Sequence, residues 1–276
     1  MLVPFIGRWY FSSVLAAVAR ELQESGVQWT VHDLSGSSAS CQDTVDLNML
    51  RGRADAVLVI GIDLDSSELG PLEHARAPVA LIGAKAPGCS SVRIDDCASA
   101  QRAVNYLANL GHERIALIGG SHAEPLHVTA PMDRRIGYRQ ALRAHNLPCD
   151  PTLEIQSDFS VSGGERAMAT LLGLPTPPTA VFAACDEMAF GAMRVLRDSG
   201  VRTPESMSVV GFDDHDMSDL LGLTTVAQPV AEQGRIAARA LLTALKEPNQ
   251  APQDILLPTH LAIRATAGPP LQGADW

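Results

Sequence analysis

The sequence predicts an α/β protein of two lobes, each a parallel β-sheet flanked by helices. Short apolar runs rich in β-branched residues alternate with amphipathic segments along the 276 residues, which is typical of βα units. The apolar runs are continuous rather than alternating in polarity, and this favours strands buried on both faces of a parallel sheet. A chain of this length is also expected to form about two domains.

Each expected strand is an apolar run bounded by polar or turn-forming residues. Strands are expected at 1–6, 28–32, 56–60, 79–82, 115–118, 180–183, 208–211 and 224–227. Helices with an apolar stripe are expected at 13–25, 44–51, 66–76, 98–110, 133–145, 163–172, 187–199 and 232–246. Gly26, Gly111 and Gly200 directly follow three of these helices, where a left-handed residue commonly ends a helix.

An internal similarity supports two lobes over one long sheet. Residues 54–83 and 179–211 both show a strand, an acidic loop, a helix and a strand that ends in glycine. About eight parallel strands in series would make an unusually large single unit. The sequence therefore predicts two related lobes, with a boundary near Gly111.

The charge balance argues against a nucleic-acid surface in this chain. Lys and Arg number 21 against 31 Asp and Glu, and the formal net charge of −10 repels phosphate backbones. The five cysteines are an odd number without a CxxC pair, which indicates a reducing compartment. No apolar run reaches the roughly 18 residues of a membrane-spanning helix. A cytoplasmic protein with no membrane partner is expected.

Sequence fingerprints of enzymes are absent. The chain has no GxGxxG, GxxxxGK[ST], GxSxG or HExxH motif. His122, Glu124 and His127 could be metal ligands, but a proline-containing loop gives them no helical register on which to converge. No enzyme, cofactor or metal site is expected. An alternative is an α/β enzyme that uses Asp213 and Asp214 with a metal, whose activity chelation would abolish.

The candidate site lies where the predicted strands end. In open parallel sheets, ligands bind outside the carboxyl ends of the strands. Arg134, near the start of its helix, is expected at the same edge. Carboxylates and amides hydrogen-bond to hydroxyls and aromatic rings offer flat apolar faces, so the set suits a sugar-like ligand over which the lobes close. The residues that follow strands are Arg8, Trp9, Tyr10, Phe11, Asp33, Asp63, Asp186, Asp213 and Gln228.

Five motifs occur in a characteristic order along residues 1–268. They are GHERIALIGG at 111–120, R-x-x-G-Y from Arg134 to Tyr138, AVFAACDEMAFG at 180–191, PESMSVVGFDD at 204–214, and LTTVAQ at 223–228 with Gly234. In these motifs the chain resembles the effector-binding part of the LacI/GalR family of bacterial transcription regulators. The resemblance implies a periplasmic-binding-protein-like fold of type I, with two Rossmann-like parallel-sheet lobes joined by three crossovers near Gly111, Gln228 and Pro258.

The resemblance also implies bounds and roles. The N-terminal lobe would cover 1–111 and 229–257, the C-terminal lobe 112–228 and 258–268, and a tail 269–276. Arg134, Asp213 and Gln228 match family positions that contact ligand. Phe159 falls where many members stack an aromatic ring on the ligand, and Tyr10 and Phe11 match aromatic positions after the first strand. Two departures are Arg8-Trp9 in place of Asn-Pro and Cys185 in place of Asn.

The function implied by the resemblance is sensing without bond breaking. A small effector, a sugar or related metabolite, would shift a lobe-closure equilibrium in a homodimer. Operator DNA would be bound only through an N-terminal helix-turn-helix of about 60 residues, which this sequence does not contain. The alternative is a secreted solute-binding protein of a sugar transporter, with residues 1–19 as a signal peptide. Arg8 interrupts that apolar stretch, and cleavage would remove the first strand.

Overall fold

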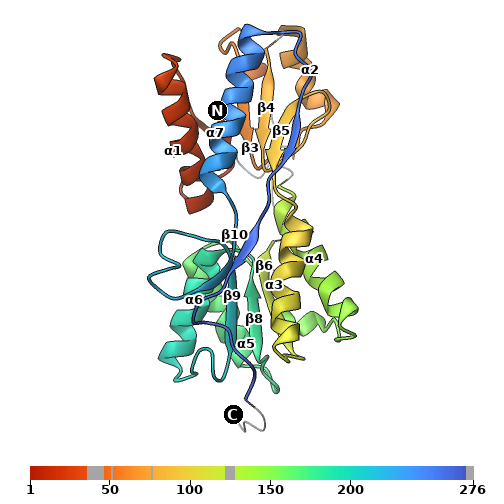
Figure 1. Ribbon diagram of the computed structural model, residues 1–276, viewed down its shortest axis with the longest axis vertical. Helices are drawn as coiled ribbons and strands as arrows, with labels where there is room; N and C mark the ends of the chain where they lie inside the picture. The colour runs from red at the N-terminus through yellow and green to blue at the C-terminus, as the bar shows by residue number, and fades with distance from the viewer. Residues whose placement is uncertain (36–46, 51, 76, 122–127, 272–276) are drawn as a thin grey trace. The chain divides into compact units, whose positions relative to one another are not determined.

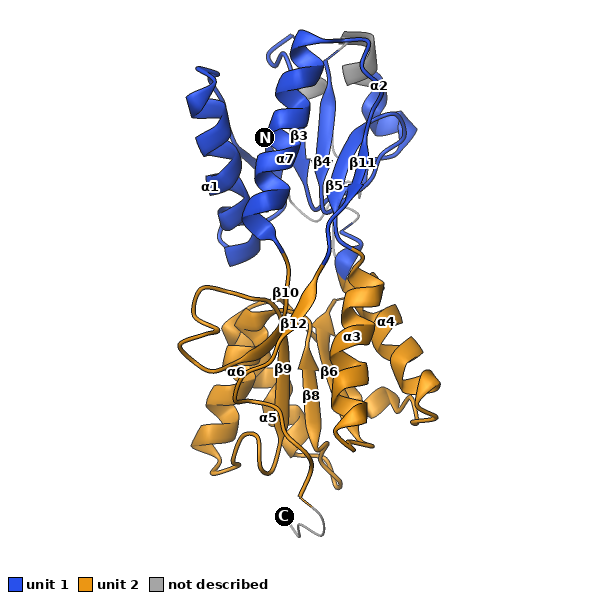
Figure 2. Ribbon diagram, in the orientation of Figure 1, with its two compact units in different colours: residues 1–94, 123–130, 229–258 blue, residues 95–122, 131–228, 259–276 orange. Residues whose placement is uncertain are grey.

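A computed structural model describes the chain except residues 36–46, 51, 76, 122–127 and 272–276 (Figure 1). Two compact units, each an α/β structure built on one sheet, make up the chain (Figure 2). Unit 1 comprises Met1–Ile94, Ala123–Ala130 and Pro229–Pro258, and unit 2 comprises Asp95–His122, Pro131–Gln228 and Thr259–Trp276. The predicted α/β class with two mainly parallel sheets is confirmed.

The sheet of unit 1 is parallel at every described pairing, in the strand order β11-β5-β4-β3-β1-β2. Its strands are β1 (Leu2–Val3), β2 (His32–Asp33), β3 (Val57–Ile60), β4 (Val79–Ile82), β5 (Ser90–Arg93) and β11 (Asp254–Leu256). Its helices are α1 (Trp9–Glu24), the short 3-10 helix η1 (Leu47–Leu50), α2 (Ser66–Ala75) and α7 (Val230–Lys246).

Helices and loops bury both faces of this sheet. In β3, Leu58 and Ile60 face a core that includes Val14 of α1, while Val57 and Val59 face a second core that includes Leu69 of α2. This alternation follows the two-residue period of a strand. Helices α1 and α7 lie side by side on the first face (Figure 1). The continuous apolar runs of the sequence thus reflect burial on two sides.

The sheet of unit 2 has the order β12-β10-β9-β8-β6-β7 and is parallel except where β12 pairs antiparallel with β10. Its strands are β6 (Ile115–Gly120), β7 (Glu154–Ser157), β8 (Ala180–Ala183), β9 (Ser208–Asp213), β10 (Thr224–Ala227) and β12 (His260–Ala262). Its helices are α3 (Asp96–Asn109), α4 (Ala130–Ala144), the 3-10 helix η2 (Pro151–Leu153), α5 (Val161–Leu172) and α6 (Asp186–Asp198).

Helix α3 belongs to unit 2, and this moves the first boundary. The chain passes from unit 1 to unit 2 between Ile94 and Asp95, not at the expected position near Gly111, because α3 packs on strands β6, β8, β9, β10 and β12. The expected boundary followed a glycine after a helix, which marks where a helix ends but not which sheet it covers. The other passages lie at 122–123, 130–131, 228–229 and 258–259.

Strands β5, β7, β11 and β12 were not expected. They are short, and their sequences SSVR, EIQS, DIL and HLA lack a long apolar run. Three of them are edge strands, and β7, β11 and β12 are only partly buried. Residues 44–46 and 51 of one expected helix lie outside the described part of the chain, and its middle forms η1.

Helices α5 and α6 approach closely through two glycines. A Cβ atom at Gly164 would lie 2.1 Å from the Met188 carbonyl oxygen, and one at Gly191 would lie 1.9 Å from the Val161 carbonyl oxygen. Only glycine allows this contact, which holds the first turn of α6 in place. Within the described residues, no helix combines the length and apolar character needed to cross a membrane.

His112 ties the C-terminal segment to the sheet of unit 2. The imidazole is 2% exposed, and its Nε2 lies 2.9 Å from the Gly268 carbonyl oxygen and 3.0 Å from the Ser208 hydroxyl. Because a carbonyl only accepts, Nε2 carries the proton, and Nδ1 accepts from the Thr179 hydroxyl at 2.9 Å. Burial lowers the pKa of His112, opposed by the bond to Gly268.

A second buried anchor is Asp186, the first residue of α6, which is 0% exposed. Its Oδ2 accepts from the His215 backbone N–H at 2.8 Å and the Ser218 hydroxyl at 2.6 Å, and its Oδ1 accepts from the Thr225 hydroxyl at 2.7 Å. A Cβ at Gly211 would lie 2.1 Å from Oδ1. The carboxylate therefore joins α6 to β10 and to the segment between β9 and β10.

The pH dependence of stability should report the His112 contact. Because the folded-state pKa is lowered, the unfolded chain binds a proton more readily, so the contribution is complete above the unfolded value near 6.5 and falls as pH drops below it. We expect His112→Ala to lower the free energy of unfolding by about 2–3 kcal/mol at pH 7.5. The loss should shrink at pH 5.5 in urea titrations. An equal loss at both values would contradict a buried neutral imidazole.

Replacing Asp186 should destabilise unit 2. Asp186→Ala leaves three donors without their acceptor, so the free energy of unfolding should fall by about 2–4 kcal/mol. Asp219→Ala is the matched control, because the Asp219 side chain is 91% exposed and pairs with Arg264 at 3.3 Å. Its effect should stay under about 1 kcal/mol. Equal losses for both variants in chemical denaturation would contradict an anchoring role for Asp186.

Candidate functional site

Three residues expected in the site come together at the carboxyl edge of the unit 2 sheet. Asp213 ends β9, and Gln228 directly follows β10, whose last residue, Ala227, pairs with Asp213. Arg134 projects from the first half of α4, and all three are buried, with 6–7% of each residue exposed. The parallel arrangement places these strand ends side by side, as the sequence predicts.

The Arg134 guanidinium is held on several sides. Its Nε donates to Asp96 Oδ1 at 2.8 Å, and its Nη1 donates to the Ala184 carbonyl oxygen at 2.5 Å and lies 3.8 Å from Asp213 Oδ1. The cation stacks on the Phe212 ring, 3.6 Å from its centroid. Burial lowers the pKa of Arg134, but Asp96 and Asp213 outweigh it and raise the pKa overall. The group is therefore a fixed, permanently charged donor.

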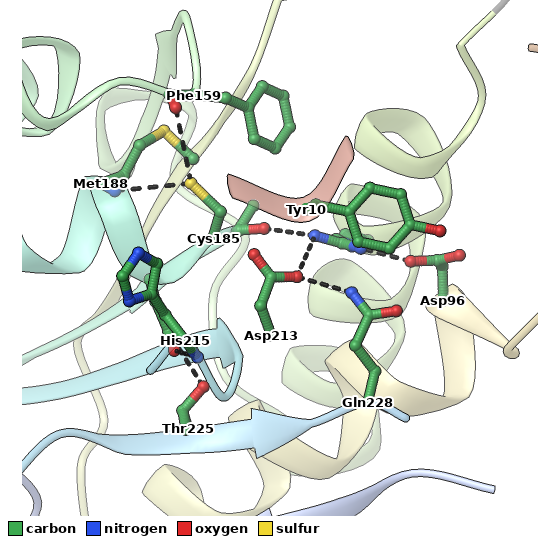
Figure 3. A network of polar contacts seen from close by, with 12 residues as sticks. Tyr10, Asp96, Phe159, Cys185, Met188, Asp213, His215, Thr225 and Gln228 are labelled. Atoms are coloured by element: carbon green, nitrogen blue, oxygen red, sulfur yellow. Dashed lines mark hydrogen bonds and ion pairs between the residues drawn. The ribbon is translucent and has the colours of Figure 1, made fainter. Parts of the chain in front are cut away.

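Asp213 and Gln228 form a second polar pair beside Arg134. The Gln228 amide donates from Nε2 to Asp213 Oδ1 at 2.6 Å (Figure 3). Burial raises the pKa of Asp213 to about 8; Arg134 opposes this increase and Asp186 adds to it. Asp213 Oδ2 makes no hydrogen bond to any residue that the structure describes. It can act as an acceptor, or as a donor when the carboxyl group is protonated.

The backbone at this edge adopts a conformation that is unusual for side-chain-bearing residues. Asp213 has φ of 124°, Asp214 has φ of 61° and Phe159 has φ of 55°. Such residues cost of order 1–3 kcal/mol each and cluster at functional sites. Arg264 helps to hold this turn, since its Nη2 donates to Asp214 Oδ1 at 2.7 Å and its Nη1 to the Leu223 carbonyl oxygen at 2.8 Å.

Phe159 and Cys185 are linked next to this trio. The Cys185 thiol lies 3.9 Å from the Phe159 carbonyl oxygen and accepts from the Met188 backbone N–H at 3.4 Å, which caps α6 (Figure 3). Burial raises the pKa of Cys185 well above its usual value, so the thiol is neutral. A Cβ at Gly120 would lie 2.3 Å from the Phe159 ring. The half-buried ring therefore rests on the end of β6.

Asp186 was expected to contact ligand, and the structure gives it another role. Its carboxylate is enclosed and accepts from Thr225, Ser218 and His215. Burial raises the pKa of Asp186 to about 6, opposed by these three donors. A carboxyl group with no exposed surface acts on a ligand only through the structure it supports. Asp186 was expected in the site because it follows a strand. That position does not distinguish a carboxylate that binds neighbouring protein groups from one that contacts a ligand.

The aromatic residues at the start of α1 belong to unit 1. Phe11 is 7% exposed within the core of that unit, and Trp9 and Tyr10 pack against the same core. The Tyr10 hydroxyl donates to Gln233 Oε1 of α7 at 3.0 Å. These residues, expected after the first strand and before a helix at 13–25, thus form the first turn of that helix, and Phe11 in particular serves packing. Arg8, just before the helix, stacks on Phe5 with 3.6 Å between its Cζ and the ring centroid.

The two remaining candidate acids also lie in unit 1 and bind backbone there. Asp33, exposed at the end of β2, accepts from the Ser35 backbone N–H at 3.0 Å. Asp63, after β3, accepts from the Lys85 backbone N–H at 2.7 Å. Both bonds stabilise loops at the carboxyl edge of that sheet. Their assignment as ligand contacts stays a prediction.

Asp96 and Phe212 were missed by reasoning from the sequence. Asp96 is the first residue of α3, and Asp95 before it accepts from the Ala98 backbone N–H as a helix cap. Two adjacent acids before an amphipathic segment ordinarily indicate a helix start, which hides the ion pair of the second acid. Phe212 lies inside an apolar strand and gives no sign of the cation above it. An acid at a helix start and a phenylalanine in a strand are both common, so neither pattern predicts a contact with Arg134.

Metal ligation has no support among the described residues. No group of three or more His, Cys, Asp or Glu is placed to hold an ion there. His122, Glu124 and His127, considered above as ligands, lie outside the described residues, as does Cys41. Cys97, Cys149 and Cys185 are free thiols.

Comparison with known proteins identifies relatives of this arrangement. A family model described as a periplasmic binding protein-like domain matches residues 104–267. The HTH-type transcriptional repressor CytR of Escherichia coli (strain K12) is 32% identical over 271 residues, which cover 96% of this chain and 78% of the repressor.

Solved structures of transcriptional regulators are also similar to this chain. A complex of the transcriptional regulator CelR with cellobiose is 31% identical, with a TM-score of 0.81, covering 96% of this chain and 83% of that one. A LacI family transcriptional regulator from Enterococcus faecium with bound ribose is 29% identical, with a TM-score of 0.84 and 97% of each chain covered. The chain therefore belongs to the LacI/GalR family of transcriptional regulators and carries the ligand-binding domain of such a regulator.

Proposed function

We propose that this domain binds a small polyhydroxyl effector, a sugar, at the carboxyl edge of the unit 2 sheet, and thereby modulates DNA binding by the regulator. The observation that carries the proposal is the buried group of Arg134, Asp213 and Gln228. A fixed cationic donor beside a carboxyl acceptor matches a hydroxyl group, which donates one hydrogen bond and accepts others.

Two relatives support a sugar as the ligand. The structures of similar regulators contain cellobiose and ribose, and the same fold spans nearly the whole of this chain. Phe159 supplies an aromatic face next to the polar trio, which suits the apolar face of a sugar ring. We propose Arg134, Asp213, Gln228 and Phe159 as the ligand-binding residues of unit 2. For Trp9, Tyr10, Phe11, Asp33 and Asp63 of unit 1, contact with a ligand stays a prediction from the sequence.

The signal would arise from differential affinity. A ligand shifts a conformational equilibrium only as far as its affinities for the two states differ. We propose that the regulator works in the cytoplasm as a homodimer, catalyses no reaction, and contacts operator DNA through a separate N-terminal helix-turn-helix. A formal net charge of −10 makes the ligand-binding domain itself a poor partner for DNA.

The ligand can be found by thermal unfolding in the presence of sugars, sugar phosphates and purines. A ligand at 100 times its dissociation constant adds about 2.7 kcal/mol to the stability of the folded state, which raises the melting temperature by a measurable amount. Stabilisation by purines and by no sugar would contradict the proposed sugar specificity.

Arg134→Ala should weaken binding of that ligand at least tenfold, because a hydrogen bond from a charged donor contributes about 1.5–3 kcal/mol. Arg135→Ala is the control, since Arg135 pairs with Glu154 at 2.6 Å, away from the trio. Calorimetry should show near-normal affinity for the control. Unchanged affinity of the Arg134 variant would remove Arg134 from the site.

A further inference from the structure

We propose that Asp96 makes the Arg134 site selective for uncharged polyhydroxyl ligands, by neutralising the guanidinium so that phosphorylated and carboxylated sugars are rejected. This inference rests on the proposed ligand site and names the class of ligand that the site accepts. It concerns residues of unit 2 alone, and Asp96 is a specificity residue that acts through Arg134.

The first argument is the charge of the cluster. The side chains of Arg134, Asp96 and Asp213 are 9%, 11% and 8% exposed, so water screens their charges weakly. One cation faces two carboxyl groups. With Asp96 ionised, the charges of the three side chains sum to zero when Asp213 is protonated and to −1 when Asp213 is ionised. The pKa of Asp213 is raised further by Asp186 and Glu187, which add negative potential. Neither protonation state leaves a positive charge for an anionic ligand.

The second argument is the geometry of the donors. A phosphate or carboxylate is bound most strongly by two parallel N–H groups along one edge of a guanidinium. On Arg134, one edge is occupied because Nε donates to Asp96, and the other because Nη1 donates to Ala184. Nη2 makes no hydrogen bond to the residues that the structure describes. A single nitrogen suffices for a hydroxyl oxygen, but it cannot form the paired contact that an oxyanion prefers.

The third argument concerns desolvation. An anionic ligand entering this buried site would lose its hydration and gain no unpaired cation in return. To bind at Arg134 it would have to displace Asp96, which would break the buried ion pair between Asp96 and Arg134. A neutral hydroxyl needs no such exchange, because it adds one hydrogen bond at Nη2 and one at Asp213 Oδ2.

The test uses inorganic phosphate as the anion probe. Melting temperatures of the protein, of Asp96→Asn and of Asp95→Asn are measured in rising phosphate, against sodium chloride of equal ionic strength at pH 7.5. Asp95→Asn is the matched control, because it removes the same charge one residue away and Asn remains a good helix cap. General salting effects of phosphate are common to all variants.

We expect saturable stabilisation by phosphate in Asp96→Asn, with an affinity at least tenfold above that of the unchanged protein and of Asp95→Asn. Adding Arg134→Ala to Asp96→Asn should abolish it. Phosphate binding by the unchanged protein as tight as in Asp96→Asn, or no gain in Asp96→Asn, would overturn the proposal.

A second measurement needs no variant. The unchanged protein is titrated with ribose and glucose, and with ribose 5-phosphate and glucuronate as their respective charged counterparts. We expect each neutral sugar that binds to have an affinity at least tenfold higher than that of its charged counterpart. A charged sugar that binds as tightly as the neutral one overturns it, whether or not Asp96→Asn folds. Binding of no sugar, charged or neutral, would count against the proposed function, while the phosphate comparison would still decide the role of Asp96.

Discussion

The arrangement of unit 2 depends on keeping one guanidinium charged inside the protein. A buried cation without acceptors would cost several kcal/mol, so each element near Arg134 contributes something to it. Helix α3 supplies the Asp96 carboxylate, the residue after β8 supplies the Ala184 carbonyl, and β9 supplies both the Phe212 ring and Asp213. The strand ends are consequently held in register by polar contacts at the edge, beyond the apolar packing below them.

The sequence predicted the parts of this structure that have a local cause. Runs such as 180–183 and 224–227 are strands as expected, because burial on both faces demands continuous apolar residues. The convergence of Arg134, Asp213 and Gln228 also followed, since parallel strands end at one edge. The features that the sequence could not show depend on partners distant along the chain. Helix α3 packs on the second sheet, and the Asp186 carboxylate accepts hydrogen bonds from Ser218, Thr225 and the backbone of His215.

Asp186 and Asp213 lie at the same edge of the sheet, but their surroundings give their carboxyl groups different roles. Asp186 and Asp213 both follow buried strand residues, and burial raises the pKa of both. Asp186 has donors on both oxygens, whereas in the described part of the chain Asp213 engages Oδ1 alone. The first therefore stabilises a turn, and the second retains an oxygen that the proposed ligand can contact. The positive φ angles of Asp213 and Asp214 fit the same division, because the contacts of Asp186 and Arg264 maintain a backbone that would otherwise relax.

The chain passes between its two units at 94–95, 122–123, 130–131, 228–229 and 258–259. Neither unit is a continuous stretch, so no single cut in the gene separates them. A chimera that exchanged one unit between two regulators would need a compatible junction at each of these passages simultaneously. With the proposed site at the strand ends, ligand preference is therefore more readily altered by point substitution there than by recombination of whole units, which favours gradual divergence of specificity on an unchanged scaffold.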